Sequence, residues 1–544
     1  MAIRALANLP SRIGDEGWSL LQIARAGVLR PQSPRQIAGM LGAMRDYGEM
    51  GALVRVAAIR DPDGVALIDE RGPVTFGELD ARSNALANKW RQRGLGPGAC
   101  VAILVRNHRG FLDAFFAAGK CGARILLLNT DFGSGQLEEV VEREGVDLLV
   151  NDDEYSDAVA GINPRVGRIR AWADSPADDT IDAAIAHGDP SSPPGTGVAS
   201  KIVILTSGTT GTPKGATRSQ PWSLVPLGGL LGKVPFRARE VTECCAPMFH
   251  SLGFGHAMIT MILGSTLVLR RRFDPRRTLD SLARHRATTM TVVPIMLQRM
   301  LDLGAEALND RDPSALRIIL VSGSQLGPEL CTHAMDTFGR VIYNLYGSTE
   351  VAYATIATPQ DLAQEPGCVG TVVRGAVVKI YDDTDREAPA GTTGRIFVGN
   401  SVQFEGYTGG GSKDSLHGLM SSGDLGHFDE TGRLFIDGRD DEMIVSGGEN
   451  VFPAELEETL AAHPDIAEAA VIGVSDDAYG QRLRSFIVVR PGAALTEQEV
   501  KDYVKGRLAR FKVPRDVRFV DALPRNPTGK VLKGYLDGED GRQS

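Results

Sequence analysis

The chain has 544 residues, more than one hydrophobic core usually serves, and we expect two or more domains. Hydrophobic residues make up 42% and charged residues 23%, which is ordinary for a globular enzyme. The net charge of −9 excludes the basic surface of a nucleic-acid-binding protein. The six cysteines show neither metal nor disulfide spacing, which favours a reduced, cytoplasmic compartment.

Residues 1–50 have the pattern of a helical extension and lack the apolar core and cleavage site of a secretory signal. The apolar residues predicted to share one helical face are Trp18, Leu20, Leu21, Ile23 and Leu29. Arginines are spread among them, so the segment either packs on the main body or lies peripherally on an anionic inner-membrane surface. Packing is the favoured interpretation.

Residues 61–128 alternate between predicted strands and helices. Thr75 is placed to cap a helix that carries Glu78 three residues later. Val101–Val105 and Arg124–Leu128 are apolar strands separated by a helix. This alternation predicts a mostly parallel sheet with helices on both faces. The later run Gly253–Leu269 is too short and too polar for a membrane-spanning helix, and we expect it to be buried.

The stretch Thr206–Gly215, TSGTTGTPKG, follows the apolar strand Lys201–Leu205. Its glycines let backbone amides approach a ligand, its hydroxyls donate hydrogen bonds, and Lys214 adds a positive charge. It is not a Walker loop, because Pro213 precedes the lysine and glycine follows it. A polar surface loop is the alternative to a polyphosphate cradle. The predicted nucleotide contacts here are Thr206, Ser207, Gly208, Thr209, Thr210, Gly211 and Lys214.

This stretch resembles the phosphate loop of the adenylate-forming superfamily, which includes acyl- and aryl-CoA synthetases, luciferases and peptide-synthetase adenylation domains. The resemblance extends from about residue 55 to residue 535. It implies an α/β fold with a large N-terminal domain of several subdomains, over residues 51–439, built on mostly parallel sheets plus a β subdomain. A small mobile α+β domain over residues 440–544 would follow it.

The segment Val241–Ser251 brings Pro247, Met248, Phe249 and His250 to the end of a predicted strand, where open α/β sheets bind ligands. In the CoA synthetases that the chain resembles, this position lines the acyl pocket and the thiol tunnel. His250 is therefore the predicted gate between them. Without the resemblance, a buried core histidine would be the preferred interpretation.

Two further motifs are predicted to hold the nucleotide and its metal. Ser322, Gly323 and Ser324 end the strand Leu316–Gly323, where the family places adenine. In Asn344–Glu350, NLYGSTE, each residue has a distinct expected role. Tyr346 offers an aromatic face to adenine with Gly347 beside it, Thr349 offers a hydroxyl to the α-phosphate, and Glu350 offers a carboxylate to Mg²⁺.

A predicted β subdomain contains Gly391–Gly399 and Gly406–Tyr407. Asp424 follows it and can accept hydrogen bonds from two ribose hydroxyls. Arg439 is expected to reach the ribose and phosphate.

The C-terminal part contains the predicted moving elements. Asp441 aligns with the family's hinge position, and Gly447, Gly448 and Glu449 belong to a loop that reaches the thiol tunnel in the family's second state. Lys530, in the loop PRNPTGK, is the predicted adenylation lysine, although an exposed lysine in a turn is the alternative.

The residues and the resemblance together predict an AMP-forming acid–CoA ligase that uses ATP, Mg²⁺ and coenzyme A. The predicted catalytic residues are Thr206, His250, Glu350 and Lys530. The apolar segment PMFHSLGFG favours a medium- or long-chain fatty acid. A ligase that loads a carrier protein and a non-enzymatic scaffold are the alternatives, and an oligomer is compatible with the sequence.

Overall fold

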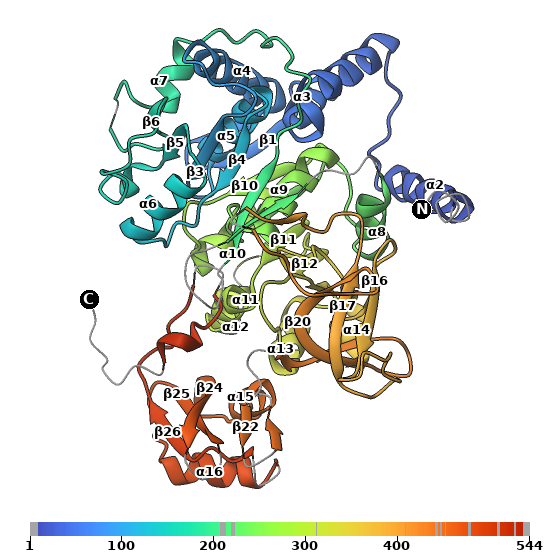
Figure 1. Cartoon of the computed structure of the whole chain (residues 1–544), viewed down its shortest axis with the longest axis vertical. Helices are drawn as coiled ribbons and strands as arrows, with labels where there is room; N and C mark the ends of the chain where they lie inside the picture. The colour runs from blue at the N-terminus through green and yellow to red at the C-terminus, as the bar shows by residue number, and fades with distance from the viewer. Residues whose placement is uncertain are drawn as a thin grey trace.

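The computed structural model describes residues 9–175, 177–206, 214–218, 223–309, 311, 313–408, 410–440, 444–446, 449–451, 453–476, 480–508, 512–526 and 529–536. Figure 1 shows a large body of sheets flanked by helices and a small domain at its lower end. This agrees with the predicted fold class.

Two sheets form the framework of the large body. The first has nine strands in the order β15-β14-β13-β12-β11-β9-β10-β1-β2, with a parallel centre and antiparallel edges. The second has seven strands in the order β18-β8-β7-β4-β3-β5-β6. The strands of the nine-stranded sheet are β1 (Val65–Asp69), β2 (Gly72–Thr75), β9 (Val241–Cys244), β10 (Thr266–Leu269), β11 (Thr289–Val292), β12 (Ile318–Val321), β13 (Ile342–Tyr346), β14 (Thr355–Ala357) and β15 (Thr371–Val372). The strands of the seven-stranded sheet are β3 (Cys100–Leu104), β4 (Arg124–Leu127), β5 (Leu148–Asn151), β6 (Gly167–Arg170), β7 (Ile202–Thr206), β8 (Lys214–Arg218) and β18 (Gly406–Tyr407).

Helices pack on these sheets and supply most of the core. The helices of the large body are α2 (Leu9–Arg25), α3 (Pro34–Arg60), α4 (Phe76–Gln92), α5 (Arg109–Lys120), α6 (Ser134–Arg143), α7 (Ile181–Ala186), α8 (Val225–Lys233), α9 (Ser251–Leu263), α10 (Pro275–His285), α11 (Pro294–Leu301), α12 (Gly304–Asn309), α13 (Pro328–Phe338) and α14 (Pro359–Gln364), with a 3₁₀ turn at Asp153–Tyr155. The largest core cluster joins α3, α4, α5 and α9 to both sheets, and Phe115 meets Phe254 edge-on across α5 and α9. The predicted capping box of Thr75 and Glu78 is confirmed at the start of α4.

Two smaller sheets complete the molecule. The β subdomain contains β16 (Val377–Tyr381), β17 (Gly394–Gly399), β19 (Ser415–Leu416), β20 (Leu419–Phe428) and β21 (Leu434–Arg439). The C-terminal unit contains β22 (Ile444–Ser446), β23 (Glu449–Val451), α15 (Pro453–Ala461), β24 (Ile466–Asp476), β25 (Gly480–Val489), α16 (Glu497–Lys505), β26 (Asp516–Phe519) and a 3₁₀ turn at Lys533–Tyr535. This unit has a hydrophobic cluster of its own, formed by α15, α16 and its sheet.

The prediction that Gly406–Tyr407 belongs to the β subdomain is wrong. These residues form β18, which pairs with β8 at the edge of the seven-stranded sheet. The backbone N–H of Thr408 also donates to the carbonyl of Gly215 at 2.9 Å. A two-residue strand has too little pattern to reveal its partner, so only the tertiary structure could assign it.

The N-terminal segment packs on the main body, as predicted, but not through the predicted face. Ile23 is buried against the cluster around α8, whereas Leu20, Leu21 and Leu29 are about half exposed. Trp18 packs so closely on α8 that a Cβ at Gly232 would lie 2.3 Å from its ring. The helix therefore buries a stripe through Trp18 and Ile23 and turns its leucines outward.

Two other sequence-based expectations concern the same body. Helix α3 crosses the predicted boundary at residue 50, with a non-helical residue at Gly48. The run Gly253–Leu269 forms most of α9 and all of β10, and its residues are largely buried as expected. Among the residues that the structure describes, no helix has the length and apolar character needed to cross a membrane.

If α2 is part of the folded body, Ile23→Ala should destabilise the protein by about 2–4 kcal/mol, because it leaves a cavity in a packed cluster. Leu20→Ala on the same helix should change stability by less than about 0.5 kcal/mol, because Leu20 is exposed. Thermal and urea unfolding of the two variants measure this difference. Equal stability of both would contradict the packing of α2.

Candidate active site

The phosphate-loop stretch is carried by a hairpin at the edge of the seven-stranded sheet. Thr206 at the end of β7 pairs with Lys214 at the start of β8, and Leu205 pairs with Gly215. The connecting residues 207–213 lie outside the described residues, and they include the predicted contacts Ser207, Gly208, Thr209, Thr210 and Gly211. The hairpin therefore fixes Thr206 directly before the loop and Lys214 directly after it.

Strand β18 connects this hairpin to Glu350. The ammonium of Lys214 lies 5.2 Å from the ring centre of Tyr407, a distance that permits a cation–π contact. The hydroxyl of Tyr407 donates a hydrogen bond to Glu350 Oε1 at 3.0 Å. Tyr407 thus bridges the predicted phosphate-binding lysine and the predicted metal-binding carboxylate.

Glu350 is held from its other side by the turn that follows β13. Ser348 donates to Glu350 Oε2 at 3.0 Å, and its hydroxyl oxygen accepts from the backbone N–H of Glu350 at 3.2 Å. Only 9% of Glu350 is exposed. Both carboxylate oxygens therefore have a hydroxyl donor, which fixes the side chain before any ligand binds.

A second cluster lies between β13 and the β subdomain. The hydroxyl of Tyr346 donates to Asp424 Oδ2 at 2.6 Å, and Arg439, opposite Asp424 in the sheet, has an amino group 3.7 Å from Oδ1. Burial raises the pKa of Asp424 above its ordinary value, while Tyr346, Arg439 and Lys530 act to lower it. The structure thus brings together the predicted adenine, ribose and phosphate residues of three separate motifs.

Lys530 approaches this cluster from the C-terminal unit. Its positive charge acts on Asp424, and its backbone N–H donates to Asn526 Oδ1 at 2.8 Å, which shapes the loop. Gly529 has φ of +78°, and a Cβ there would lie 2.2 Å from Cγ2 of Ile295. The loop is therefore docked on the N-terminal domain through a glycine that no larger residue can replace without displacement.

A hydrogen bond between the two domains supports the same orientation. Gln325 donates from its side-chain amide to Glu458 Oε1 on α15 at 2.6 Å. This contact fixes α15 beside the segment that follows β12.

His250 precedes α9 and lies beside Phe249, with ring centres 4.5 Å apart. Its Nε2 is buried and has no hydrogen-bond partner in the part of the chain that the structure describes. Burial lowers the pKa of His250 to about 4, so the ring is neutral at pH 7. Asn107 fixes the preceding turn, since it donates to the carbonyl of Ala246 at 2.9 Å and accepts from the N–H of Met248 at 2.8 Å.

The remaining predicted nucleotide residues follow β12 and β13. Ser322 is buried and donates to the carbonyl of Leu345 at 2.7 Å, while Gly323 and Ser324 are exposed. Gly347 lies so close to the following turn that a Cβ there would be 2.0 Å from the carbonyl oxygen of Ala352.

The predicted residues of the second state are only partly described. Asp441, Gly447 and Gly448 lie outside the described residues, and of Glu449 only the backbone in β23 is described. Their expected roles as hinge and thiol-tunnel loop stay predictions.

Sequence reasoning missed three residues that the structure places at the site. These are Asn107, Tyr407 and Lys413, whose Nζ would lie 3.1 Å from a Cβ at Gly423. Asn107 comes two residues after the predicted apolar strand Val101–Val105, and that position was a usable signal. Tyr407 and Lys413 lie in a loop-rich stretch whose partners are distant in sequence.

The residues around Glu350 fit a magnesium ion that arrives with ATP. Mg²⁺ commonly keeps water ligands and takes one or two carboxylates together with substrate phosphates. Glu350 supplies one oriented carboxylate, with the hydroxyl-bearing Ser348 and Thr349 beside it. No group of three or more His, Cys, Asp or Glu side chains suited to a metal occurs among the described residues.

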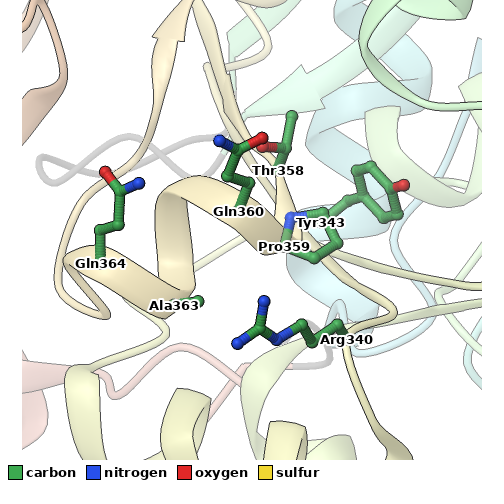
Figure 2. Close-up of a pocket in the computed structure, with 7 residues that line it drawn as sticks. All are labelled: Arg340, Tyr343, Thr358, Pro359, Gln360, Ala363 and Gln364. Carbon is green, nitrogen blue, oxygen red and sulfur yellow. The ribbon is translucent and has the colours of Figure 1, made fainter.

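A shallow pocket of about 700 Å³ lies away from these residues. It is lined by Arg340, which precedes β13, by Tyr343 and by residues along the whole of α14 and its N-cap. Figure 2 shows Arg340 beneath α14 with its guanidinium directed toward the side that carries Ala363. Tyr346 and Glu350 lie at and beyond the opposite end of β13, so this pocket is not part of the nucleotide site.

The fold and the gathered residues define an adenylate-forming enzyme, which uses ATP to activate a carboxylic acid. The chain belongs to the AMP-binding enzyme family: residues 54–408 match that family, and residues 455–530 match the AMP-binding enzyme C-terminal domain. Within it the chain is an AMP-forming acid–CoA ligase, for which ATP and CoA are substrates and Mg²⁺ is generally required.

Named relatives share most of the chain. It is 33% identical over 487 residues to 2-succinylbenzoate–CoA ligase of Geobacillus kaustophilus, covering 88% of this chain and 96% of the relative. It is 30% identical to feruloyl-CoA synthase of an Amycolatopsis species, covering 91% and 99%. Among solved structures, o-succinylbenzoate CoA synthetase of Bacillus subtilis with its acyl-adenylate matches with a TM-score of 0.79 and 27% identity, covering 90% and 98%.

The bridge through Tyr407 predicts the behaviour of Tyr407→Phe, which keeps the ring but removes the donor to Glu350. A hydrogen bond to a charged group contributes about 1.5–3 kcal/mol, so adenylate formation should fall by about 10- to 150-fold. The Mg²⁺ concentration for half-maximal rate should rise, because Glu350 is no longer oriented. Pyrophosphate exchange measured across a Mg²⁺ series tests both expectations.

The matched control is Tyr343→Phe, on the same strand β13 but in the remote pocket. Its Mg²⁺ profile should equal that of the unaltered enzyme. If Tyr407→Phe also leaves rate and Mg²⁺ dependence unchanged, Tyr407 does not position Glu350.

Proposed function

We propose that the enzyme uses ATP to adenylate a hydrophobic monocarboxylic acid, with an alkyl or aryl tail, and then transfers the acyl group to CoA. AMP and pyrophosphate are the other products. The observation that carries the adenylation step is the docked C-terminal loop, which brings Lys530 within electrostatic range of Asp424. The acid class is argued separately below.

The first half-reaction is an electrostatic problem, because a carboxylate must approach the negatively charged α-phosphate. Lys530, Arg439 and Lys214 would supply positive charge from three segments of the chain. Asp424 would accept the ribose hydroxyls, and Tyr346 would present its ring to adenine while its hydroxyl keeps Asp424 in place. Mg²⁺, when bound at Glu350, would neutralise charge on the phosphate oxygens.

The second half-reaction needs an open path for the thiol to the acyl carbon. Lys530 acts on Asp424 in this structure, and we propose that this is the orientation for adenylation and that the C-terminal unit then rotates about Asp441. The loop that contains Gly447 and Gly448 would replace Lys530 near the thiol path. His250, neutral and without a hydrogen-bond partner among the described residues, would be the gate between the acid pocket and that path.

The uncharged character of the proposed acid-binding segment supports a substrate whose tail carries no charge. The segment Pro247–Gly255 has no charged residue, and burial keeps its only histidine, His250, neutral at pH 7. A second carboxylate on the substrate would therefore be buried here without a counter-charge, which is costly. This argument favours the fatty acid predicted from sequence, and it equally admits apolar aryl acids.

The names of the relatives widen the acid class beyond fatty acids. They include ligases for ferulate and for 2-succinylbenzoate, a dicarboxylate that lies outside the uncharged-tail class proposed above, and a fatty acid–[acyl-carrier-protein] ligase of Streptomyces coeruleorubidus at 28% identity. Because of this last relative, transfer to a carrier protein is the second candidate function.

A panel of acids with ATP and either CoA or a pantetheine-bearing carrier protein tests the proposal. Medium- and long-chain fatty acids and uncharged aryl acids should support pyrophosphate exchange, whereas dicarboxylates such as malonate should not. CoA should be the preferred acceptor. A preference for dicarboxylates would refute the acid class, and transfer only to the carrier protein would establish the second candidate.

The docked loop predicts that Lys530→Ala affects one half-reaction only. The lost charge is worth about 2–4 kcal/mol in the transition state, so adenylate formation should fall by about 30- to 1000-fold. Thioester formation from preformed acyl-adenylate and CoA should stay close to normal. Single-turnover assays of each half-reaction measure this contrast.

Gly529→Val should reproduce that pattern without removing a charge. A valine there would combine a strained positive φ with a clash against Ile295, so the loop could not dock. Gly534→Ala is the matched control, because a Cβ at Gly534 meets nothing within 4 Å. Equal slowing of both half-reactions by Lys530→Ala and Gly529→Val would refute the two-orientation mechanism.

A further inference from the structure

Exposed aliphatic side chains are concentrated in the N-terminal segment. Of the eleven large hydrophobic residues that are exposed in the described part of the chain, six lie between residues 13 and 41. They are Ile13, Leu20, Leu21, Leu29, Ile37 and Leu41. On α2 the spacing of Ile13, Leu20 and Leu21 places them on one face, and Ile37 and Leu41 are one turn apart on α3.

The opposite face of α2 is anchored to the body by polar contacts. Asp15 forms an ion pair with Arg374 at 2.8 Å. Glu16 accepts hydrogen bonds from the hydroxyl of Ser223 at 2.7 Å and from the backbone N–H of Leu224 at 2.9 Å. Arg374 also lies over the ring of Trp18, 4.6 Å from its centre. Because these contacts fix one side of α2 against the body, its aliphatic face is directed outward.

These contacts also determine the charge of the outer side. The only acidic residues before Asp46 are Asp15 and Glu16, and both are engaged by the body. Residues 17–45 contain no acidic residue and four arginines, all exposed: Arg25, Arg30, Arg35 and Arg45, of which Arg45 forms an ion pair with Asp46 at 2.8 Å. The segment is thus basic in a chain whose net charge is −9.

More positive charge lies beside the turn between α2 and α3. Arg60 and Arg239 donate to the carbonyls of Val28 and Gly27 in that turn. Burial and the neighbouring charges of Arg239 and Arg30 lower the pKa of Arg60, against the opposite effect of Asp61. Asp61 is the acidic group among the described residues that acts on Arg60.

We propose that the N-terminal outer face, formed by these six aliphatic residues and four exposed arginines, docks on an anionic lipid surface. Aliphatic side chains would enter the interface while the arginines contact lipid phosphates. In Figure 1, α2 and the N-terminal end of α3 lie at one edge of the molecule, away from the C-terminal unit. Docking there leaves the C-terminal unit free to rotate.

Charge and composition favour lipid over the other occupants. In a symmetric dimer the same patch meets its own copy, which would bring the exposed Arg25, Arg30 and Arg35 of one copy against those of the other. Protein–protein hot spots are rich in Trp, Tyr and Arg and poor in Leu, whereas this face is mainly aliphatic and Trp18 and Tyr47 of the segment are engaged with the body.

Co-sedimentation of the full-length enzyme with vesicles tests the proposal. Vesicles of phosphatidylcholine with about one quarter phosphatidylglycerol should bind it, and pure phosphatidylcholine vesicles should bind at least about tenfold more weakly. Leu20→Gln/Leu21→Gln/Leu41→Gln should weaken binding to anionic vesicles by about tenfold or more. Arg25→Gln/Arg35→Gln should weaken it by about tenfold at low salt, and less as salt is raised.

The matched control is Val377→Gln/Phe519→Gln, which replaces two similarly exposed hydrophobic residues elsewhere on the surface. It should bind vesicles like the unaltered enzyme, and all variants should keep normal pyrophosphate exchange with a water-soluble acid. Equal loss of binding in the control, unchanged binding in the leucine variant, or equal affinity for neutral vesicles would overturn the proposal. So would a dimer in sedimentation velocity that the leucine variant abolishes while no vesicle binding is seen.

Discussion

Repulsion between a carboxylate and the α-phosphate of ATP is the constraint on which this structure depends. No single element could supply enough positive charge and still release its product. In the proposed mechanism the charge would come from Lys214 on β8, Arg439 on β21 and Lys530 in the C-terminal unit. Gly529 lets the last of these dock closely on Ile295. A cation carried by a separate unit could contribute to one step and withdraw before the next. The contacts released on withdrawal would include the close approach of Gly529 to Ile295 and the hydrogen bond from Gln325 to Glu458.

The carboxylates at the site are oriented by hydroxyl groups rather than by ion pairs alone. Glu350 accepts from Ser348 and Tyr407, and Asp424 accepts from Tyr346. A neutral donor fixes a carboxylate without cancelling its charge, so it remains available to a metal ion or to ribose hydroxyls. Strand β18, which the sequence-based prediction assigned to the β subdomain, matters for this reason, because it carries Tyr407 beside Glu350.

Helix α2 of the N-terminal segment has one side packed on the body and the other side exposed. Its acidic residues and Trp18 face the body, and its leucines and arginines face outward. Periodicity alone groups apolar residues into a face but does not say whether that face is inside. The sequence-based prediction placed Leu20 and Leu21 with Trp18 and Ile23, and this was wrong because the glycines of α8 receive Trp18 and Ser19, while Ile23 packs in the adjoining cluster.

The sequence by itself determined the family, the α/β fold and most of the candidate site, because phosphate loops and strand ends are local patterns whose chemistry is visible in consecutive residues. Thr75 and Glu78 even identified a helix start, since a capping box depends on neighbours only. What only the tertiary structure decided were contacts between distant segments. This group contains the pairing of β18 with β8, the Tyr407–Glu350 hydrogen bond, the orientation that brings Lys530 to Asp424 and the outward face of α2. Each depends on packing between surfaces far apart in the chain, and no local propensity encodes which surface meets which.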